Sequence, residues 1–372
     1  MRTKNLIIGL VCLFVLIVVF SVTTRSQKLE ERAKCQIIEI GTGIGPKWSQ
    51  DGTKIAFRSG LAWARGIWMC LAKADGKGEI QKLFEIPKTA YRYHWLDSTE
   101  FIFQERELVR ENEKGRLLHT IDRITAINLN GQKRLIAEVI SEPGRSASFD
   151  ISAPIFLPDG TVGYYEVPPG KRVWETENMV FKVIKQGKLS PDSALKQMVV
   201  FERDLSVPGH IDQSIWLESV DGSINKKITS CGHCSFPKLS PDGTKILVMC
   251  GGICAACVLD LDGKEICVGK EDVRSIDPLD SAVIEWGVGG LPTWSPGSKK
   301  IAYAYVKSKS PSEHDVYIVG SDLYMENPDG SGRLQLTNTP DKVVGNPVWS
   351  PDGTKIACDD FLSSRVYVIK LK

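Results

Sequence analysis

The sequence lacks the short motifs that identify many enzyme classes. It has no Gly-x-Ser-x-Gly nucleophile elbow, no P-loop, no His-Glu-x-x-His segment and no EF-hand loop. It also has no Gly-x-Gly-x-x-Gly that opens a helix. No motif therefore assigns the chain to the serine hydrolases, nucleotide-binding enzymes, zinc proteases or calcium proteins that use these signatures.

An excess of charge of either sign is also missing. The 372 residues include 47 basic and 45 acidic side chains, so the net charge is +2. This balance gives no case for nucleic acid as a partner, although it does not exclude a local basic patch. Charged residues make up 25% and hydrophobic residues 42% of the chain, which excludes general disorder. The length fits two or three domains, or one large all-β unit.

One long hydrophobic run is present, from Leu6 to Val22, and it follows Arg2 and Lys4. Residues 1–27 are therefore interpreted as a signal anchor with a polar tether, or secondly as a cleaved signal peptide. Cys12 follows Val11, which is larger than the residue expected before a lipid-modified cysteine. Because the basic N-terminus stays in the cytoplasm, we expect an extracytoplasmic protein, periplasmic or at the cell surface, anchored by one helix. Secretion after cleavage is the second choice.

Internal repeats indicate the fold. Four segments read Pro-x-Trp/Leu-Ser, followed by a turn and an apolar strand, and two further segments are degenerate copies. The aromatic or leucine anchors are Trp48, Trp95, Phe156, Leu239, Trp294 and Trp349. In the strongest copies Ser-Pro-Asp-Gly suits a tight turn, because proline fixes φ and glycine accepts positive φ. A third strand, an Asp-Gly or Asn-Gly turn and a fourth strand follow in most repeats, which predicts four-stranded antiparallel blades.

We therefore expect an all-β propeller, with residues 28–372 as a single domain after the N-terminal helix. Six blades are favoured and seven are the alternative, because only about six strand-like runs lie between 154 and 229. We expect an inserted hairpin near 168–213. The run at 35–40 is predicted to supply the missing fourth strand of the last blade and so to close the ring.

These repeats resemble those of the TolB-type, WD-like propeller family of extracytoplasmic bacterial proteins, over roughly residues 35–372. Similar repeats occur in the propellers of prolyl-oligopeptidase-like and tricorn-like proteases and of oligogalacturonate lyases. The chain has no room for the N-terminal α/β domain of TolB itself. The resemblance implies a propeller fold and envelope-associated protein partners, and it does not identify them.

Long, irregular segments are expected on the face that carries the second-to-third loops and the blade connections. His119, His210, His233 and His314 map to this long-loop face, and His94 begins a first strand. One hypothesis is a shared binding or acid/base site near the channel mouth, and the other is that polar loops simply contain histidines. The charged segment 105–116 is interpreted as a solvated, helix-like insertion. Asp359 and Asp360 are expected to face solvent.

Six of the ten cysteines fall between 231 and 267. Cys231, Cys234, Cys254 and Cys257 form two Cys-x-x-Cys pairs with the spacing of a zinc site, and Cys250 lies close by. Because export leads to an oxidising compartment, disulfides are the leading interpretation. Zinc and free or redox-active thiols are the alternatives. No other cofactor is expected.

The leading functional hypothesis is a binding or scaffold module that recognises an envelope protein or a glycan through its long-loop face. A binding role is favoured over an enzymatic one. The first alternative is a lyase-like enzyme acting on oligosaccharides through histidine and carboxylate groups at the channel mouth. The second is a thiol redox or zinc protein.

Overall fold

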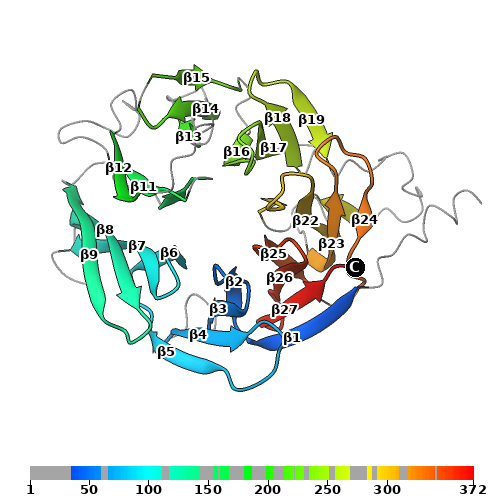
Figure 1. The fold of residues 1–372 in the computed structure, drawn as a ribbon, viewed down its shortest axis with the longest axis horizontal. Coiled ribbons are helices and arrows are strands. Elements are labelled where there is room, and N and C mark those ends of the chain that lie inside the picture. Colours follow the sequence, from blue (N-terminus) through cyan, green and yellow to red (C-terminus); the bar gives the residue numbers. More distant parts are fainter. Residues whose placement is uncertain are drawn as a thin grey trace, which may run out of the picture.

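The computed structural model describes residues 35–372 except 60–65, 111–116, 142–153, 158–159, 167–179, 187–197, 205–212, 222, 230–233, 251–255, 269–282, 287–290, 310–316 and 340–341. The described strands form seven antiparallel sheets arranged in a ring around a central opening (Figure 1). The predicted all-β propeller is confirmed.

Five of these sheets have four or more strands. The first sheet comprises β2 (Ile44–Trp48), β3 (Lys54–Arg58), β4 (Trp68–Lys73) and β5 (Gln81–Glu85). The second comprises β6 (Ala90–Trp95), β7 (Glu100–Arg110), β8 (Leu117–Asn128) and β9 (Lys133–Ser141). The fifth comprises β16 (Cys234–Leu239), β17 (Lys245–Cys250), β18 (Ala256–Asp260) and β19 (Glu265–Val268). The sixth comprises β20 (Val283–Trp286), β21 (Thr293–Trp294), β22 (Ile301–Lys309), β23 (Tyr317–Glu326) and β24 (Leu334–Gln335). The seventh joins β25 (Val344–Trp349), β26 (Lys355–Asp360) and β27 (Arg365–Lys370) to β1 (Gln36–Thr42).

The stretch from 154 to 229 corrects the favoured blade number. It contains six described strands, as many as the sequence predicts, but they divide into two separate sheets instead of one blade with an inserted hairpin. These are β10 (Ile155–Phe156), β11 (Val162–Glu166) and β12 (Val180–Lys185), then β13 (Met198–Asp204), β14 (Gln213–Ser219) and β15 (Asn225–Lys227). Each of these two sheets has three described strands. Because four strands per blade were assumed from the sequence, six strands were too few for two blades and were assigned to one blade with an inserted hairpin. The described sheets number seven, which was the alternative.

The ring closes as the sequence predicts. Strand β1 pairs antiparallel with β27, from Gln36 opposite Lys370 to Thr42 opposite Arg365. Ile40 of β1 is buried and packs in one cluster with Trp48 of the first sheet and Val368 of the seventh. The N-terminal strand thus completes the last sheet and contributes to the core between the first and last sheets.

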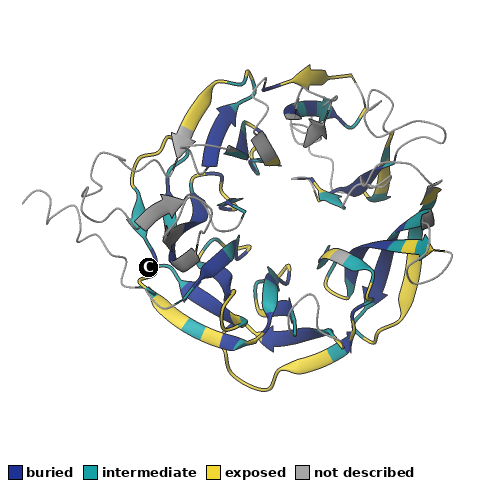
Figure 2. Ribbon diagram, turned by 180° about the vertical axis from the view of Figure 1, so that it is seen from behind, coloured by how far each residue is buried: buried dark blue, intermediate teal, exposed yellow. Residues whose placement is uncertain are grey.

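Apolar clusters of this kind fill the spaces between neighbouring sheets. The inner and middle strands are mostly buried, whereas the outer strands carry most of the exposed residues (Figure 2). Tryptophan anchors add hydrogen bonds between sheets. Trp48 Nε1 donates to the Val348 carbonyl at 2.9 Å, and Trp294 Nε1 donates to the Lys238 carbonyl at 3.0 Å.

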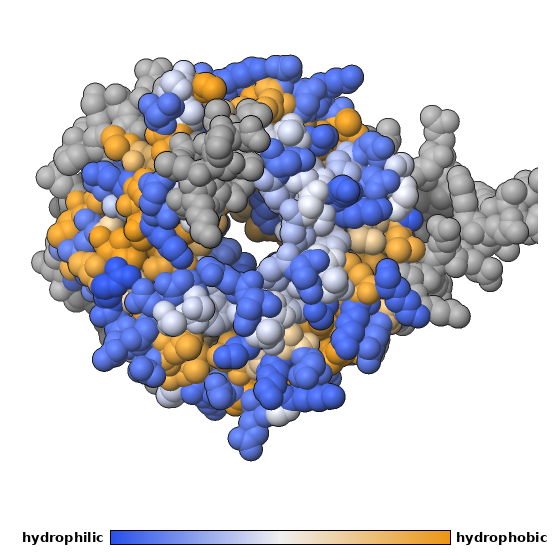
Figure 3. Space-filling view, viewed as in Figure 1, coloured by the Kyte–Doolittle hydropathy of each residue, from blue (hydrophilic) through white to orange (hydrophobic). Residues whose placement is uncertain are grey.

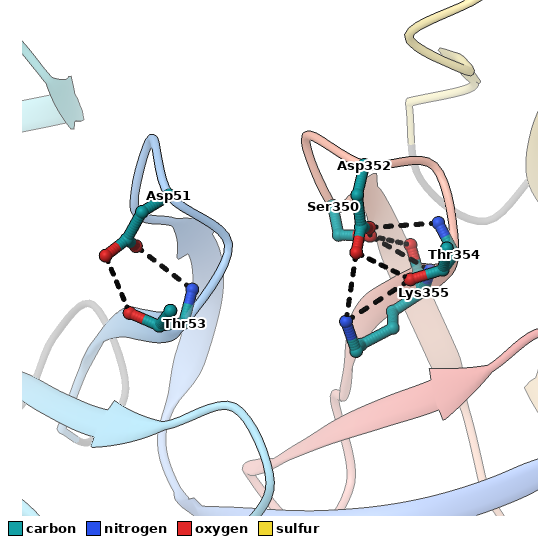
Figure 4. Close-up of polar contacts among 6 residues, drawn as sticks. All are labelled: Asp51, Thr53, Ser350, Asp352, Thr354 and Lys355. Carbon is teal, nitrogen blue, oxygen red and sulfur yellow. Dashed lines mark hydrogen bonds and ion pairs between the residues drawn. The ribbon is translucent and has the colours of Figure 1, made fainter.

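The repeated turns are stabilised by their own aspartates. Asp51 accepts hydrogen bonds from Ser49 Oγ at 2.6 Å, from Thr53 N at 3.0 Å and from Thr53 Oγ1 at 2.8 Å. Asp352 accepts the same set in the seventh sheet, from Ser350 and Thr354 (Figure 4). These bonds lower the pKa of Asp51 to about 2, because they favour its ionised form.

Two local expectations are corrected. The segment at 105–116 is not a helix-like insertion in its described part, because β7 continues to Arg110 and β8 starts at Leu117, so both strands extend an antiparallel pair. Asp359 and Asp360 do not face solvent, since both are buried and accept backbone hydrogen bonds.

The anchor predicted at 1–27 lies outside the described residues. Among those described, no helix is long and apolar enough to cross a membrane.

Candidate functional site

The middle residue of the Pro-x-Trp repeat lies on the innermost strand of its sheet, beside the central opening. In the first, second and fifth sheets this position holds Lys47, His94 and Lys238. Each is half-buried, whereas the anchor that follows in the first two sheets, Trp48 or Trp95, is buried. This alternation is typical of a strand with one face on the core and one on an accessible space. The third, sixth and seventh sheets carry Ile155, Thr293 and Val348 at this position.

Three of the innermost strands have a residue with positive φ directly before the repeat proline. Gly45, Phe236 and Asn346 precede the repeat proline and have φ values of 67°, 53° and 48°. Register shifts occur at the same places, between Ile44 and Lys47 in the first sheet, for example. A residue with positive φ in a bulge locally interrupts the ladder and reorients the strand. The repeat thus builds the same bulge beside the channel in the first, fifth and seventh sheets.

A pocket of about 400 Å³ lies at the mouth of the channel, and we call it the channel pocket. Its lining is cationic, with Lys47, Arg58, Arg92 and Lys238, and none of the described lining residues is a carboxylate. The remaining lining residues are Gly45, Pro46, Tyr93, His94, Leu291, Asn346, Pro347 and Val348. Most of the lining comes from the innermost strands β2, β6, β16 and β25 and from Arg58 at the end of β3, where the loop to the third strand begins on the long-loop face. Figure 3 shows the opening at the centre of the ring, with hydrophilic residues along part of its rim.

The two lysines in the channel pocket have lowered pKa values. Burial lowers the pKa of Lys238 to about 7, and the positive charges of Lys47 and Arg92 add to the effect. Burial also lowers the pKa of Lys47 to about 8, with Asp359 opposing the change. Lys238 Nζ donates a hydrogen bond to the Pro292 carbonyl at 2.8 Å. Near neutral pH a large part of the Lys238 population is therefore uncharged, unless an anion restores its proton.

His94 experiences the same positive environment. Burial lowers its pKa well below the usual range, and Lys47, Lys238 and Arg92 lower it further. The imidazole is therefore neutral at pH 7, and it packs against Phe156 of the next sheet with ring centroids 5.0 Å apart. Residues from the first, second and fifth sheets thus influence one another electrostatically at the centre of the ring.

Asp359 is a buried carboxylate that acts electrostatically on Lys47. It accepts hydrogen bonds from Gly45 N at 2.7 Å and from Asn346 Nδ2 at 3.2 Å, so it joins the first and seventh sheets. Burial raises its pKa to about 6 in spite of these bonds. Gly45 also accepts a hydrogen bond at its carbonyl from the Tyr93 hydroxyl. These bonds hold the rim of the pocket in place.

Two arginines remain available for a ligand. Arg58 Nε is buried and has no hydrogen-bond partner among the described residues. Arg92 is exposed at the pocket, beside the half-buried His94. Guanidinium groups bind carboxylates and phosphates through two parallel hydrogen bonds. A buried donor without a partner is costly, and an anionic ligand in the channel pocket would satisfy it.

The histidines singled out from the sequence do not form this site in the described structure. His119 lies on β8 opposite Val109, far out on the extended hairpin of the second sheet. His210, His233 and His314 lie outside the described residues. The histidine in the channel pocket is His94, which the sequence analysis placed at the start of a first strand but did not select.

The cysteine cluster is described only in part. Cys231 and Cys254 lie outside the described residues, and Cys234 and Cys250 are backbone partners in the pairing of β16 with β17. Cys257 is fully buried in an apolar cluster, where its thiol donates a hydrogen bond to Glu265 Oε1 at 2.9 Å. Within the described residues no group of three or more histidine, cysteine, aspartate or glutamate side chains is placed to hold a metal. Disulfide, zinc and redox roles therefore remain predictions.

Lys47, Lys238, Arg58 and Arg92 were not predicted from the sequence. A usable signal was present, because the alternation of a strand puts the middle residue of Pro-x-Trp opposite the buried anchor. Aligning the repeats at that position shows a basic or imidazole side chain in three of them. Arg58 and Arg92 carry no comparable signal, since their place beside the channel depends on how neighbouring sheets are positioned.

No family model and no curated protein matches this chain. The TolB-type resemblance therefore rests on the repeats alone. Solved structures with a similar fold include a gluconolactonase from Xanthomonas campestris, with 15% identity and a TM-score of 0.44 over 93% of this chain and 92% of that one. An oligogalacturonate lyase in complex with manganese has 13% identity and a TM-score of 0.41, over 91% and 94%. The Cps50 (Swd1) propeller domain of Myceliophthora thermophila has 11% identity and a TM-score of 0.44, over 91% and 99%. These similarities concern the fold and carry no argument about function.

Proposed function

We propose that this protein is a binding module that takes a negatively charged group of its ligand into the channel pocket. The rest of the ligand, an acidic glycan or an acidic segment of an envelope protein, would lie on the long-loop face. The observation that carries the proposal is the convergence of Lys47, Arg58, Arg92 and Lys238 on one pocket, where the described part of the lining has no carboxylate. In a chain with a net charge of +2, this is a local concentration of positive charge.

The size and chemistry of the channel pocket support this proposal. Its volume of about 400 Å³ lies at the lower end of the range for small-molecule sites. Lysines with lowered pKa values regain their protons when an anion binds, because the opposite charge favours the ammonium form. Arg58 Nε offers a buried donor that has no partner in the part of the chain that the structure describes. An acidic sugar such as a uronate, with one carboxylate on a polar ring, has the right class of groups.

Calorimetry tests this function with glucuronate and with its neutral counterpart glucose. The full-length protein is kept in detergent because of its apolar N-terminal run. We expect glucuronate to bind and glucose to bind far more weakly. The Lys47→Met/Lys238→Met variant should lose at least about tenfold in affinity, because each charged hydrogen bond is worth about 1.5–3 kcal/mol. Lys264→Met, which changes an exposed lysine elsewhere, is the control. Equal affinities for the two sugars, or no loss in the double variant, would contradict the proposal.

We further propose the setting in which this binding takes place. Residues 1–27 would anchor the propeller to a membrane, with the channel pocket on the extracytoplasmic side. The support is the apolar run from Leu6 to Val22 after a basic start. Fractionation and protease protection of the full-length chain test this, because an anchored propeller stays with the membrane and is digested only from the outer side.

A second candidate function is supported by the lowered pKa of Lys238. An amine that is partly neutral near pH 7 acts as a general base, and the arginines beside it would neutralise a substrate carboxylate. In a uronide, Lys238 would take the proton on the carbon beside the carboxylate. The bond between the neighbouring carbon and its glycosidic oxygen then breaks and a carbon–carbon double bond forms. The leaving oxygen takes a proton from water, so the rest of the oligosaccharide departs as an alcohol. This is the lyase-like alternative, with Lys238 in place of the predicted histidines.

Ultraviolet absorbance of the unsaturated product tests this reaction on oligogalacturonate. Product formation that Lys238→Met abolishes and Lys264→Met does not would establish the lyase. Binding without any product would leave the binding module as the function.

A further inference from the structure

A second group of lysines lies on the opposite face of the ring, where the first and last sheets meet. Lys54 and Lys73 are direct partners in the pairing of β3 with β4. Lys355 and Lys370 are direct partners in the pairing of β26 with β27. Like charges directly opposite each other on a sheet are destabilising. Two such pairs in adjacent sheets are therefore unfavourable unless an anion lies between them.

These lysines line a pocket of about 380 Å³, which we call the seam pocket. The other lining residues are Gly52, Thr53, Ala74 and Asp75. Four lysines against one aspartate give a formal charge of +3. The lining comes from the first-to-second and third-to-fourth strand turns, so the seam pocket lies on the turn face. The two neighbouring turns approach each other closely, since a Cβ on Gly52 would lie 3.5 Å from Pro351 Cδ.

Most of the nearby carboxylates are already engaged within their own turns. Asp51 accepts three hydrogen bonds from Ser49 and Thr53, and Asp75 accepts one from Lys77 N. Asp352 is bound by Ser350 and Thr354, and it also contacts Lys355 Nζ at 3.3 Å (Figure 4). No ion pair is described for Lys54, Lys73 or Lys370 among the residues that the structure places. The pocket therefore holds more positive charge than its own carboxylates compensate.

We propose that the seam pocket binds a compact phosphate-type anion, either free or as the headgroup of a lipid. Lysine binds phosphate as a point charge, and several ammonium groups around a small cavity suit a multiply charged oxyanion. The seam pocket shares no lining residue with the channel pocket, and the two pockets lie on opposite faces of the ring.

The position of the seam pocket links anion binding to ring closure. Lys54 and Lys73 belong to the first sheet, whereas Lys355 and Lys370 belong to the last, which β1 completes. An anion held by both sheets binds the closed ring and not the open or unfolded chain. Such a ligand raises the free energy of unfolding in proportion to the logarithm of its concentration. The anion would thus strengthen the closure of the ring, in which β1 is held to β27 by backbone pairing and not by the chain itself.

Titration calorimetry with inorganic pyrophosphate tests the site on the full-length protein. The Lys73→Gln/Lys370→Gln variant removes one lysine of each opposed pair. We expect its affinity at the seam pocket to fall at least about tenfold, because charged hydrogen bonds are lost. Lys47→Gln/Lys238→Gln changes only the channel pocket, so it should keep the seam component. Pyrophosphate binding that is the same in the wild type and in the seam variant overturns the proposal, whatever the channel variant does.

Thermal unfolding at low ionic strength gives a second, independent readout. Without an anion, the seam variant should unfold at a higher temperature than the wild type, because opposed positive charges have been removed. Pyrophosphate should raise the midpoint of the wild type and not that of the seam variant. Lys299→Gln, an exposed lysine on the same face of the sixth sheet, is the control and should change neither result. A seam variant that keeps the pyrophosphate effect contradicts the inference.

Vesicles distinguish the two sources of the phosphate group. Binding to phosphatidylglycerol vesicles but not to phosphatidylcholine vesicles, lost in the seam variant, assigns a lipid headgroup. Pyrophosphate binding without vesicle binding assigns a free anion. If neither probe distinguishes the wild type from the seam variant, the site does not exist.

Discussion

Trp48 Nε1 donates a hydrogen bond to the carbonyl of Val348, 300 positions later in the chain. The same relation joins Trp95 to Lys47 at 3.2 Å and Trp294 to Lys238 at 3.0 Å. In each case the carbonyl of a channel-lining residue accepts a bond from the tryptophan of the following sheet. The backbone that positions the two channel lysines is therefore held by the repeat itself.

The hydrogen bonds of the tryptophan anchors predict that Trp→Phe lowers the free energy of unfolding by different amounts at Trp48 and at Trp349. Trp48→Phe removes a donor and leaves the Val348 carbonyl without this partner, so it should cost about 1–3 kcal/mol beyond the loss of volume. Trp349 is equally buried, but its Nε1 has no partner among the described residues. Trp349→Phe should therefore cost only the loss of volume. Denaturant unfolding of both variants measures the difference, and equal losses would contradict this account of the anchors.

The closing strand predicts a sharp contrast within β1. Ile40 is buried between the first and last sheets, whereas Ile37 is 44% exposed. Ile40→Ala should lower the free energy of unfolding by about 2–5 kcal/mol. Ile37→Ala should change it by no more than about 0.5 kcal/mol. Chemical unfolding curves test this, and similar losses would show that β1 contributes little to the core.

A buried ion pair joins β7 and β8 in the second sheet. Arg106 and Asp122 are joined by two hydrogen bonds, at 2.6 and 2.7 Å, with side chains only 7% and 1% exposed. Asp122→Ala leaves a buried guanidinium without its carboxylate and should cost about 3–5 kcal/mol. Arg106→Met/Asp122→Leu should recover most of that loss, since both charges are removed. A double variant as unstable as the single one would show that the pair itself provides the stability.

The channel lysines predict opposite pH dependences for stability and for anion binding. Lys238 has a pKa of about 7 in the folded protein and 10.5 when unfolded. Between these values the unfolded chain binds more protons, so the contribution of Lys238 to stability rises with pH. Affinity for glucuronate should instead fall by up to about tenfold per pH unit above pH 7, because the charged form is lost. Lys238→Met should flatten both profiles, and unchanged profiles would contradict the assigned pKa.

The ring and its closure follow from the sequence because both depend on local rules. Each Ser-Pro-Asp-Gly turn with its flanking strands specifies a hairpin, and the apolar run at 35–40 needs a partner edge. The blade number was harder to predict. The stretch from 154 to 229 supplies six strands, and only the pairing of these strands shows that they form two sheets.

The candidate site was harder to predict from the sequence than the fold, for a physical reason. Lys47, His94 and Lys238 are 47 and 144 positions apart along the chain, and only the curvature of the ring brings them together. The buried state of Asp359 also depends on contacts from another sheet, through Gly45 and Asn346. Sequence patterns indicate which face of a strand is exposed, but they do not show which exposed faces meet.

The most direct test of the channel pocket is a crystal structure of the protein with bound citrate. We expect a citrate carboxylate within about 2.7–3.2 Å of Lys47 Nζ or Lys238 Nζ and of the Arg58 guanidinium. We also expect the citrate density to be absent in the Lys47→Met/Lys238→Met variant. A channel in which these cations are instead paired with carboxylates of the protein itself, with citrate absent, would contradict the proposed anion site.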